Sequence, residues 1–77
     1  MRNKRYVLIV PDDIYTRYLE DFIIKNLEME LFSTGCGTTE FQSTKKPRRF
    51  KERVLKNFGT CVFDRISLFE RDGLYED

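Results

Sequence analysis

Residues 5–10 read RYVLIV, and this short stretch decides the fold. Every side chain after Arg5 is apolar, most of them are β-branched or aromatic, and Pro11 closes the run. A continuous apolar run of this kind is typical of a central strand that is covered on both of its faces. We therefore expect the rest of the chain to build a sheet around this strand.

The segment that follows, PDDIYTRYLEDFIIKNL at residues 11–27, changes to a helical period. Apolar side chains recur at spacings of three and four, which predicts a helix with one broad buried face. Asp12 and Asp13 precede that face, and either carboxylate could accept hydrogen bonds from the free amides of the first turn. We expect one of the two to cap the helix.

Two more strands are expected in the middle of the chain. Residues 27–32, LEMELF, alternate apolar and acidic side chains, which favours a half-buried strand; extension of the first helix is the alternative. Residues 33–38, STGCGT, supply a turn, and residues 39–44, TEFQST, return as the next strand.

The second half of the chain predicts one helix and one strand. Pro47 opens a helix with an apolar arc, and Gly59 stands where that helix is expected to end. The opposite arc carries Arg49, Arg53 and Lys56. Residues 60–70, TCVFDRISLFE, are rich in β-branched and aromatic side chains and predict the last strand, and residues 70–77 predict a frayed polar tail.

The order strand, helix, strand, strand, helix, strand predicts an α+β fold of the ferredoxin-like βαββαβ type. Right-handed connections place the strands in the order 4-1-3-2, which gives a four-stranded antiparallel sheet with two helices on one face. A chain of 77 residues can bury only one core, so residues 1–77 are expected to form a single domain.

The charges are distributed unevenly along the chain. Residues 45–56 hold seven of the 14 basic residues and one of the 13 acidic residues, and residues 1–10 add three basic residues and no acid. The predicted topology brings these two segments to one edge of the sheet. The resulting basic edge comprises Arg2, Lys4, Arg5, Lys45, Lys46, Arg48, Arg49, Arg53 and Lys56.

An edge with one sign of charge is typical of a phosphate-binding surface, and we expect a small non-catalytic protein that binds nucleic acid there. The alternative partner is an acidic protein surface, which would make the chain an inhibitor or adaptor, for example a phage or mobile-element protein that blocks a host or nucleic-acid-processing complex. A solvated helix neutralised by the acidic tail explains the same charges without a partner. The net charge of only +1 counts against a dedicated nucleic-acid binder.

The second candidate surface is the sheet face that two helices would leave open. Val7, Ile9 and Phe63 are expected on it, and an exposed apolar face on so small a domain indicates a homodimer or partner site. Tyr6 and Phe41 fall on the strands that carry stacking aromatics in RNA-recognition modules. Residues 38–44, TTEFQST, lack the basic residues and glycines of that pattern, which disfavours this interpretation.

Few residues are available for catalysis or metal binding. The chain has no histidine and only two cysteines, so neither a metal nor a cofactor is expected. The stretches VLIVPDD at residues 7–13 and FDRISLFERDG at residues 63–73 resemble, in outline, the small CRISPR-associated nucleases of spacer acquisition. The resemblance implies a dimeric ferredoxin-like fold with an aspartate after its first strand. Helix capping explains Asp12 more simply, and we expect no enzymatic activity.

The sequence also bears on location. No apolar run approaches the roughly 20 residues that a membrane-spanning helix needs. The basic N-terminal residues are followed by an apolar run that stops at Pro11, which is too short for the core of a signal peptide. We therefore expect a cytoplasmic protein that does not bind membranes.

Overall fold

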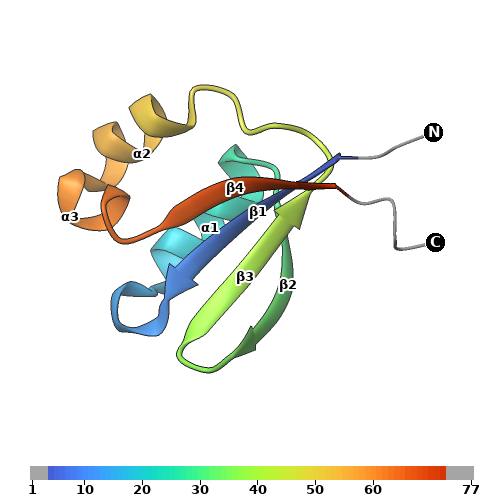
Figure 1. The fold of residues 1–77 in the computed structure, drawn as a ribbon. Helices are drawn as coiled ribbons and strands as arrows, with labels where there is room; N and C mark the ends of the chain where they lie inside the picture. The colour runs from blue at the N-terminus through green and yellow to red at the C-terminus, as the bar shows by residue number, and fades with distance from the viewer. Residues whose placement is uncertain (1–3, 73–77) are drawn as a thin grey trace.

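A four-stranded antiparallel sheet forms the centre of the protein in a computed structural model that describes residues 4–72 (Figure 1). The strands lie in the order β2-β3-β1-β4. They are β1 (Lys4–Pro11), β2 (Glu30–Gly35), β3 (Thr38–Ser43) and β4 (Ser67–Asp72). The helices are α1 (Arg17–Asn26), α2 (Phe50–Phe58) and the short α3 (Thr60–Phe63), with a 3-10 turn η1 (Asp12–Ile14). The chain therefore has an α+β fold.

The strand predicted from RYVLIV is confirmed as β1, which pairs with β3 on one side and β4 on the other. Side chains alternate along β1 and so define two faces of the sheet. Leu8 lies opposite Phe41 of β3, and both point to what we call the core face. Val7 lies between Gln42 of β3 and Phe69 of β4, and these three point to what we call the open face.

The core face is closed by apolar side chains from the helices. Leu8 and Phe41 are completely buried, and they form one cluster with Val54 of α2 and three residues of α1. Figure 1 shows α1 behind the sheet, where it supplies these residues. The α1 members are Leu19, Phe22 and Ile23. Because each large buried side chain contributes about 1.5 to 3 kcal/mol, this cluster is the main source of stability.

Helix α1 begins later than the sequence predicts. Its cap is Thr16, whose Oγ1 accepts a hydrogen bond from the Leu19 amide at 3.0 Å. The predicted cap at Asp12 or Asp13 is wrong because both residues lie in η1, the turn by which the chain leaves the sheet. The Asp12 amide donates to the Gly37 carbonyl oxygen at 2.9 Å, which ties η1 to the turn between β2 and β3.

The connection from α1 to β2 decides between the two interpretations of residues 27–32. Helix α1 ends at Asn26 and β2 begins at Glu30, so the strand is confirmed for residues 30–32 and the helical extension is wrong. Leu27 and Met29 are buried in the core cluster. Glu28, between them, adopts a left-handed backbone with φ of 56°.

Helix α2 ends where the sequence predicts, but the predicted start at Pro47 is wrong, because the helix begins at Phe50. Gly59 has φ of 82°, and its amide donates to the Leu55 carbonyl oxygen at 2.9 Å. A positive φ at this position is far less costly for glycine than for any other residue. The chain can therefore turn sharply after α2.

The strand predicted over residues 60–70 is wrong for its first half. Residues Thr60–Phe63 form α3, and β4 begins only at Ser67. Ser67 pairs with Ile9, close to the end of β1, so an earlier start would leave most of the added residues without a partner strand. Phe63 packs instead against Phe50 of α2, with ring centroids 6.0 Å apart.

The predicted open face therefore loses one of its residues. Phe63 packs against the core cluster from α3 and does not share a face with Val7 and Ile9. Strand β4 continues to Asp72 and so includes residues 70–72, which the sequence places in the polar tail. Residues 73–77 of that tail, and Arg2 of the predicted basic edge, lie outside the described residues.

Candidate functional site

The packing of α1 against α2 brings basic residues from separate segments together. The Phe58 ring of α2 lies 5.3 Å from Tyr18 and 5.1 Å from Phe22 of α1, measured between ring centroids. Farther along the pair, Arg53 Nη1 donates to the Asn26 carbonyl oxygen at 3.0 Å. The two helices thus run antiparallel, and the last turn of α1 lies beside the first turns of α2.

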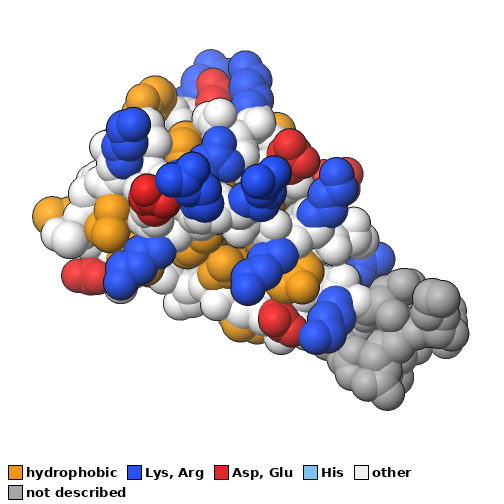
Figure 2. Space-filling view, turned by 90° about the horizontal axis from the view of Figure 1, so that it is seen from above, with side chains coloured by type: hydrophobic (Ala, Val, Ile, Leu, Met, Phe, Trp, Pro, Cys, Tyr) orange, Lys and Arg blue, Asp and Glu red, His pale blue; other side chains and the backbone are white. Residues whose placement is uncertain are grey.

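A hollow of about 670 Å³ lies at this junction, and we call it the basic groove. Within the described chain its cations are Lys25, Arg48, Arg49, Arg53 and Lys56, and its carboxylates are Glu28 and Glu52. Five cations against two carboxylates leave an excess of three positive charges. Lys and Arg side chains predominate on the side of the molecule seen in Figure 2, on which α2 lies in Figure 1.

One arginine of the groove, at the N-cap of α2, is held by an acid in the first turn of that helix. Arg49 Nε and Nη2 donate to the two carboxylate oxygens of Glu52 at 2.9 and 3.1 Å. These hydrogen bonds, and then the paired charges, lower the pKa of the Glu52 carboxyl and raise the pKa of the Arg49 guanidinium. Both side chains are largely exposed, so the pair is weak and exchangeable.

The remaining cations differ in how firmly they are held. Arg53 is anchored by the Asn26 carbonyl oxygen, as described above. Among residues 4–72, Arg48 and Lys56 have no carboxylate within ion-pair distance. These two side chains can meet an anion without first breaking an ion pair.

Two residues beside the groove have strained backbones. Glu28 follows α1 with φ of 56°, and Arg49 precedes α2 with φ of 53°. Residues other than glycine seldom adopt this left-handed conformation, which costs about 1 kcal/mol or more. Helices commonly end in a left-handed residue, and Glu28 directly follows the C-cap Leu27 of α1. An N-cap residue usually has an extended backbone, so the conformation of Arg49 is the less common of the two.

The structure does not keep the predicted basic edge together, since its described residues line two hollows or neither. The basic groove receives four of the predicted residues, namely Arg48, Arg49, Arg53 and Lys56. Arg5 and Lys45 line a different hollow. Lys4 forms an ion pair with Glu70 of β4 at 3.3 Å, and Lys46 is exposed.

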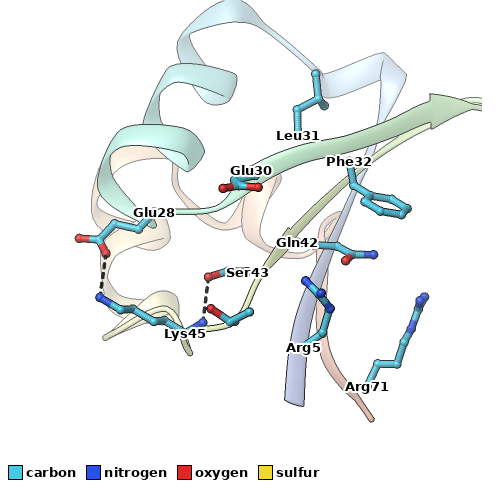
Figure 3. A pocket seen from close by; sticks show the side chains of 10 residues that line it. Arg5, Glu28, Glu30, Leu31, Phe32, Gln42, Ser43, Lys45 and Arg71 are labelled. Atoms are coloured by element: carbon cyan, nitrogen blue, oxygen red, sulfur yellow. Dashed lines mark hydrogen bonds and ion pairs between the residues drawn. The ribbon is translucent and has the colours of Figure 1, made fainter. Parts of the chain in front are cut away.

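The second hollow has a volume of about 610 Å³ and lies where the open face meets the edge strand β2. We call it the sheet hollow. In Figure 3 the Arg5 and Arg71 side chains extend toward the side of the sheet on which the Phe32 ring lies. At its other end, the Lys45 ammonium is 4.0 Å from the Glu28 carboxylate. Glu28 lines both hollows, so the two are adjacent.

Two cations of these hollows, Lys25 and Arg71, are not predicted from the sequence. Lys25 falls on the polar face of α1, and only the antiparallel packing of α2 brings it to the basic groove. Arg71 lies directly opposite Arg5 in the pairing of β1 with β4. The sequence predicts that these strands pair but not their register, which alone could have identified Arg71.

Of the two carboxylates that follow β1, Asp13 is bound by an arginine outside both hollows. Arg65 Nη2 donates to both oxygens of Asp13 at 3.0 and 2.8 Å, and these hydrogen bonds lower the pKa of the Asp13 carboxyl. Asp13 thereby joins η1 to the segment between α3 and β4. In the part of the chain that the structure describes, no group of three or more His, Cys, Asp or Glu side chains could hold a metal ion.

The aromatic residues considered for an RNA-recognition module point away from the open face. Phe41 is completely buried on the core face, and Tyr6 packs against the same cluster. The exposed aromatic rings near the open face are those of Phe32 on β2 and Phe69 on β4. On the open face, a base would have to stack on one of these two rings.

Neither the helices nor a comparison with known proteins identifies a function. From Lys4 to Asp72, no helix has the length and apolar character required to cross a membrane. No family model, curated protein or solved structure matches the chain. The two hollows are therefore the features from which a function has to be inferred.

Proposed function

We propose that this chain is a small non-enzymatic binding protein that holds the backbone of a nucleic acid in the basic groove. The observation that carries the proposal is the excess of three positive charges around one hollow. A nucleic-acid backbone presents regularly spaced phosphates, and several cations that face one hollow can neutralise them together. A cytoplasmic location is part of this proposal.

The chemistry of the cations suits phosphate. A guanidinium group offers five N–H donors in a planar fork that matches two phosphate oxygens. Arg53 uses one nitrogen to hold the Asn26 carbonyl oxygen, so it is fixed in position and keeps donors for a ligand. Arg48 and Lys56 add cations that can adjust to the backbone. The groove therefore combines positioned and mobile charge.

The net charge of +1 does not oppose binding of this kind. Exposed charges act over a Debye length of about 8 to 10 Å at physiological salt, so the local potential decides. Some carboxylates of the described chain pair with cations outside the groove, such as Asp13 with Arg65 and Glu70 with Lys4. These carboxylates do not neutralise the cations of the groove directly.

We also propose that the fold is of the ferredoxin-like βαββαβ type, with both longer helices on one face. The strand order supports this assignment, since it reads β4-β1-β3-β2 from the β4 edge. Residues of α1 and α2 share one cluster with Leu8 and Phe41, which also supports it. In such a fold the basic groove lies in the helical layer, so the open face could contact a different part of the same ligand.

The test compares two double charge reversals. Arg48→Glu with Lys56→Glu changes the basic groove, and Arg17→Glu with Lys51→Glu changes two exposed cations that do not line it. Both variants lower the net charge equally. We expect the groove variant to bind a labelled single strand of about 12 nucleotides roughly tenfold or more weakly in fluorescence anisotropy. The control variant should remain near the parent affinity.

The salt dependence supplies a second measurement. Each phosphate contact that is lost should reduce the slope of log affinity against log salt by about 0.7 to 0.9, so the groove variant should lose roughly twice that amount. Equal loss of affinity in both variants would contradict a specific groove. Absence of oligonucleotide binding, together with binding of an acidic protein, would replace the proposal by the inhibitor or adaptor alternative.

A further inference from the structure

The Phe32 side chain is unusually placed for a residue that only stabilises the fold. It lies on the edge strand β2 and is 61% exposed. The pairing of β2 with β3 shifts between Leu31 and Ser33, so Phe32 is the extra residue of a bulge. Bulges at sheet edges commonly redirect a side chain toward a site. The chain thus presents a large aromatic ring to the surface.

The lining of the sheet hollow fits one nucleotide. The Phe32 ring offers a flat apolar surface, and Figure 3 shows the Gln42 amide on the same side of the sheet. Arg5 and Arg71 contribute positive charge on the side of the ring. Lys45 stands at the other end of the hollow beside Glu28. Three cations against the carboxylates Glu28 and Glu30 leave an excess of one positive charge. Stacking of a base on an aromatic ring beside cations is the usual way in which proteins hold single strands. A volume of about 610 Å³ falls within the range of small-molecule sites.

The position of the hollow connects it to the basic groove. Glu28 lines both hollows. Residues 45–49 lead directly from Lys45, at the sheet hollow, to Arg48 and Arg49, at the basic groove. One backbone could therefore follow the groove and continue past this segment to the sheet. A duplex could not stack on Phe32 in this way, because its bases are paired and stacked on one another.

We propose that the nucleic acid is single-stranded and that, where its backbone leaves the basic groove, one base stacks on Phe32 in the sheet hollow. This inference rests on the proposed function and names its ligand class. Bases of any kind offer a flat face, so the contact is tolerant of sequence. DNA and RNA single strands share the required chemistry, and both serve as probes.

The test replaces Phe32 and measures binding of a labelled single strand of about 12 nucleotides. Phe32→Ala should weaken binding roughly 5- to 150-fold, which is the usual effect of replacing a base-stacking aromatic residue by alanine. Phe32→Tyr keeps an aromatic ring and should bind like the parent chain. Phe69→Ala is the matched control, because Phe69 is also an exposed aromatic of the open face but does not line the hollow. Thermal unfolding should show that all three variants remain folded.

A spectroscopic measurement tests stacking directly. The chain has four tyrosines but no tryptophan, so Phe32→Trp introduces a single tryptophan at the proposed site, and its emission can be excited apart from that of the tyrosines. Its emission should be quenched when a DNA or RNA single strand binds, and a Phe69→Trp variant should show little change. The parent chain should bind single strands at least tenfold more tightly than a duplex of equal length.

The outcomes separate the two proposals. Unchanged affinity in Phe32→Ala, or equal affinity for duplex and single strand, would overturn this inference even if the Arg48→Glu, Lys56→Glu variant still binds weakly. Loss of binding by Phe32→Ala without quenching in Phe32→Trp would also overturn it, because the ring would then act other than by stacking. If no oligonucleotide binds the parent chain, both proposals fail.

Discussion

The two faces of the sheet bury the same strand by different means. On the core face, Leu8 is covered by apolar side chains from α1 and α2. On the open face, Val7 is also 0% exposed, but its neighbours are Gln42 and Phe69 from adjacent strands of the sheet itself. The core face therefore holds most of the apolar contacts. In the part of the chain that the structure describes, the open face carries one layer of side chains, which a ligand can contact while the sheet stays folded.

This difference changes what can be expected of self-association. Val7 offers no exposed area, and Ile9 is partly buried. The exposed apolar area on the described open face comes mainly from Phe32, at 61% exposure, and Phe69, at 44% exposure. A homodimer through this face stays a prediction, and it has less apolar area to bury than the alternation of β1 indicates.

The largest expected effect is the loss of a core phenylalanine. Phe41→Ala should lower the free energy of unfolding by about 3 to 5 kcal/mol, because it leaves a cavity under α1 and α2. Phe69→Ala, on the open face, should lower it by less than about 1 kcal/mol. Urea denaturation followed by circular dichroism measures both. Similar losses in the two variants would mean that both faces of the sheet contribute equally to the free energy of unfolding, contrary to this prediction.

The next largest effect is the pH dependence of stability that arises from Tyr15, whose ring packs against the core face. Tyr15 stacks on Phe41 with ring centroids 6.3 Å apart. Burial first, and then the hydrogen bond and charge of Glu20, raise the pKa of Tyr15 to about 12. The unfolded chain would release this proton near pH 10. The stabilising contribution is therefore complete below pH 10 and is lost as the pH rises from 10 toward 12.

The measurement compares the parent chain with Tyr15→Phe, which cannot ionise. Between pH 10 and 12 the parent should lose roughly 1 to 2 kcal/mol more than the variant, which allows for partial exposure of the ring. Lysine titration affects both proteins and cancels in the difference. Parallel stability curves over this range would show that the core face does not hold the phenol in its neutral form.

The sequence predicts those elements whose signals are local. The apolar run of β1 leaves no alternative to a central strand, and Gly59 allows the positive φ that ends α2. The start of β4 was not predictable in this way. Residues 60–63 favour a strand by composition, but α3 forms because Phe63 can pack on Phe50 and because β1 extends too short a distance to pair with them.

The residues of the candidate site also divide into those that local sequence predicts and those that only contacts between distant segments bring together. Arg48, Arg53 and Lys56 were recognisable because they lie close together in sequence. Lys25 and Arg71 come from other segments, and only helix packing and strand register bring them to the hollows. The bulge at Phe32 is likewise a product of the pairing of β2 with β3. Contacts between distant segments therefore limited the sequence-based prediction.

A smaller effect is expected at the start of α1, the helix that covers the core face. Thr16→Ala removes the oxygen that accepts from the Leu19 amide and should cost about 1 kcal/mol of stability. Asp12→Ala is the control, because the Asp12 side chain makes no capping hydrogen bond. It should change stability by less than about 0.5 kcal/mol. A larger loss in the control would restore Asp12 as the capping residue.

The smallest effect is expected from the polar contacts of the open face. Glu40 Oε2 accepts from Gln42 Nε2 at 2.7 Å and lies 3.9 Å from Arg71 Nη2. Glu40→Gln keeps the size and one acceptor oxygen but removes the charge, so stability should fall by no more than about 1 kcal/mol. The difference should shrink as salt is added, because Arg71 at 40% exposure and Glu40 at 20% exposure both keep some contact with solvent and are partly screened. A loss of about 3 kcal/mol that persists in high salt would instead mark a buried network, since removing one partner of such a pair leaves a charge without compensation. The open face would then be a second core, and its side chains would not be available to a ligand.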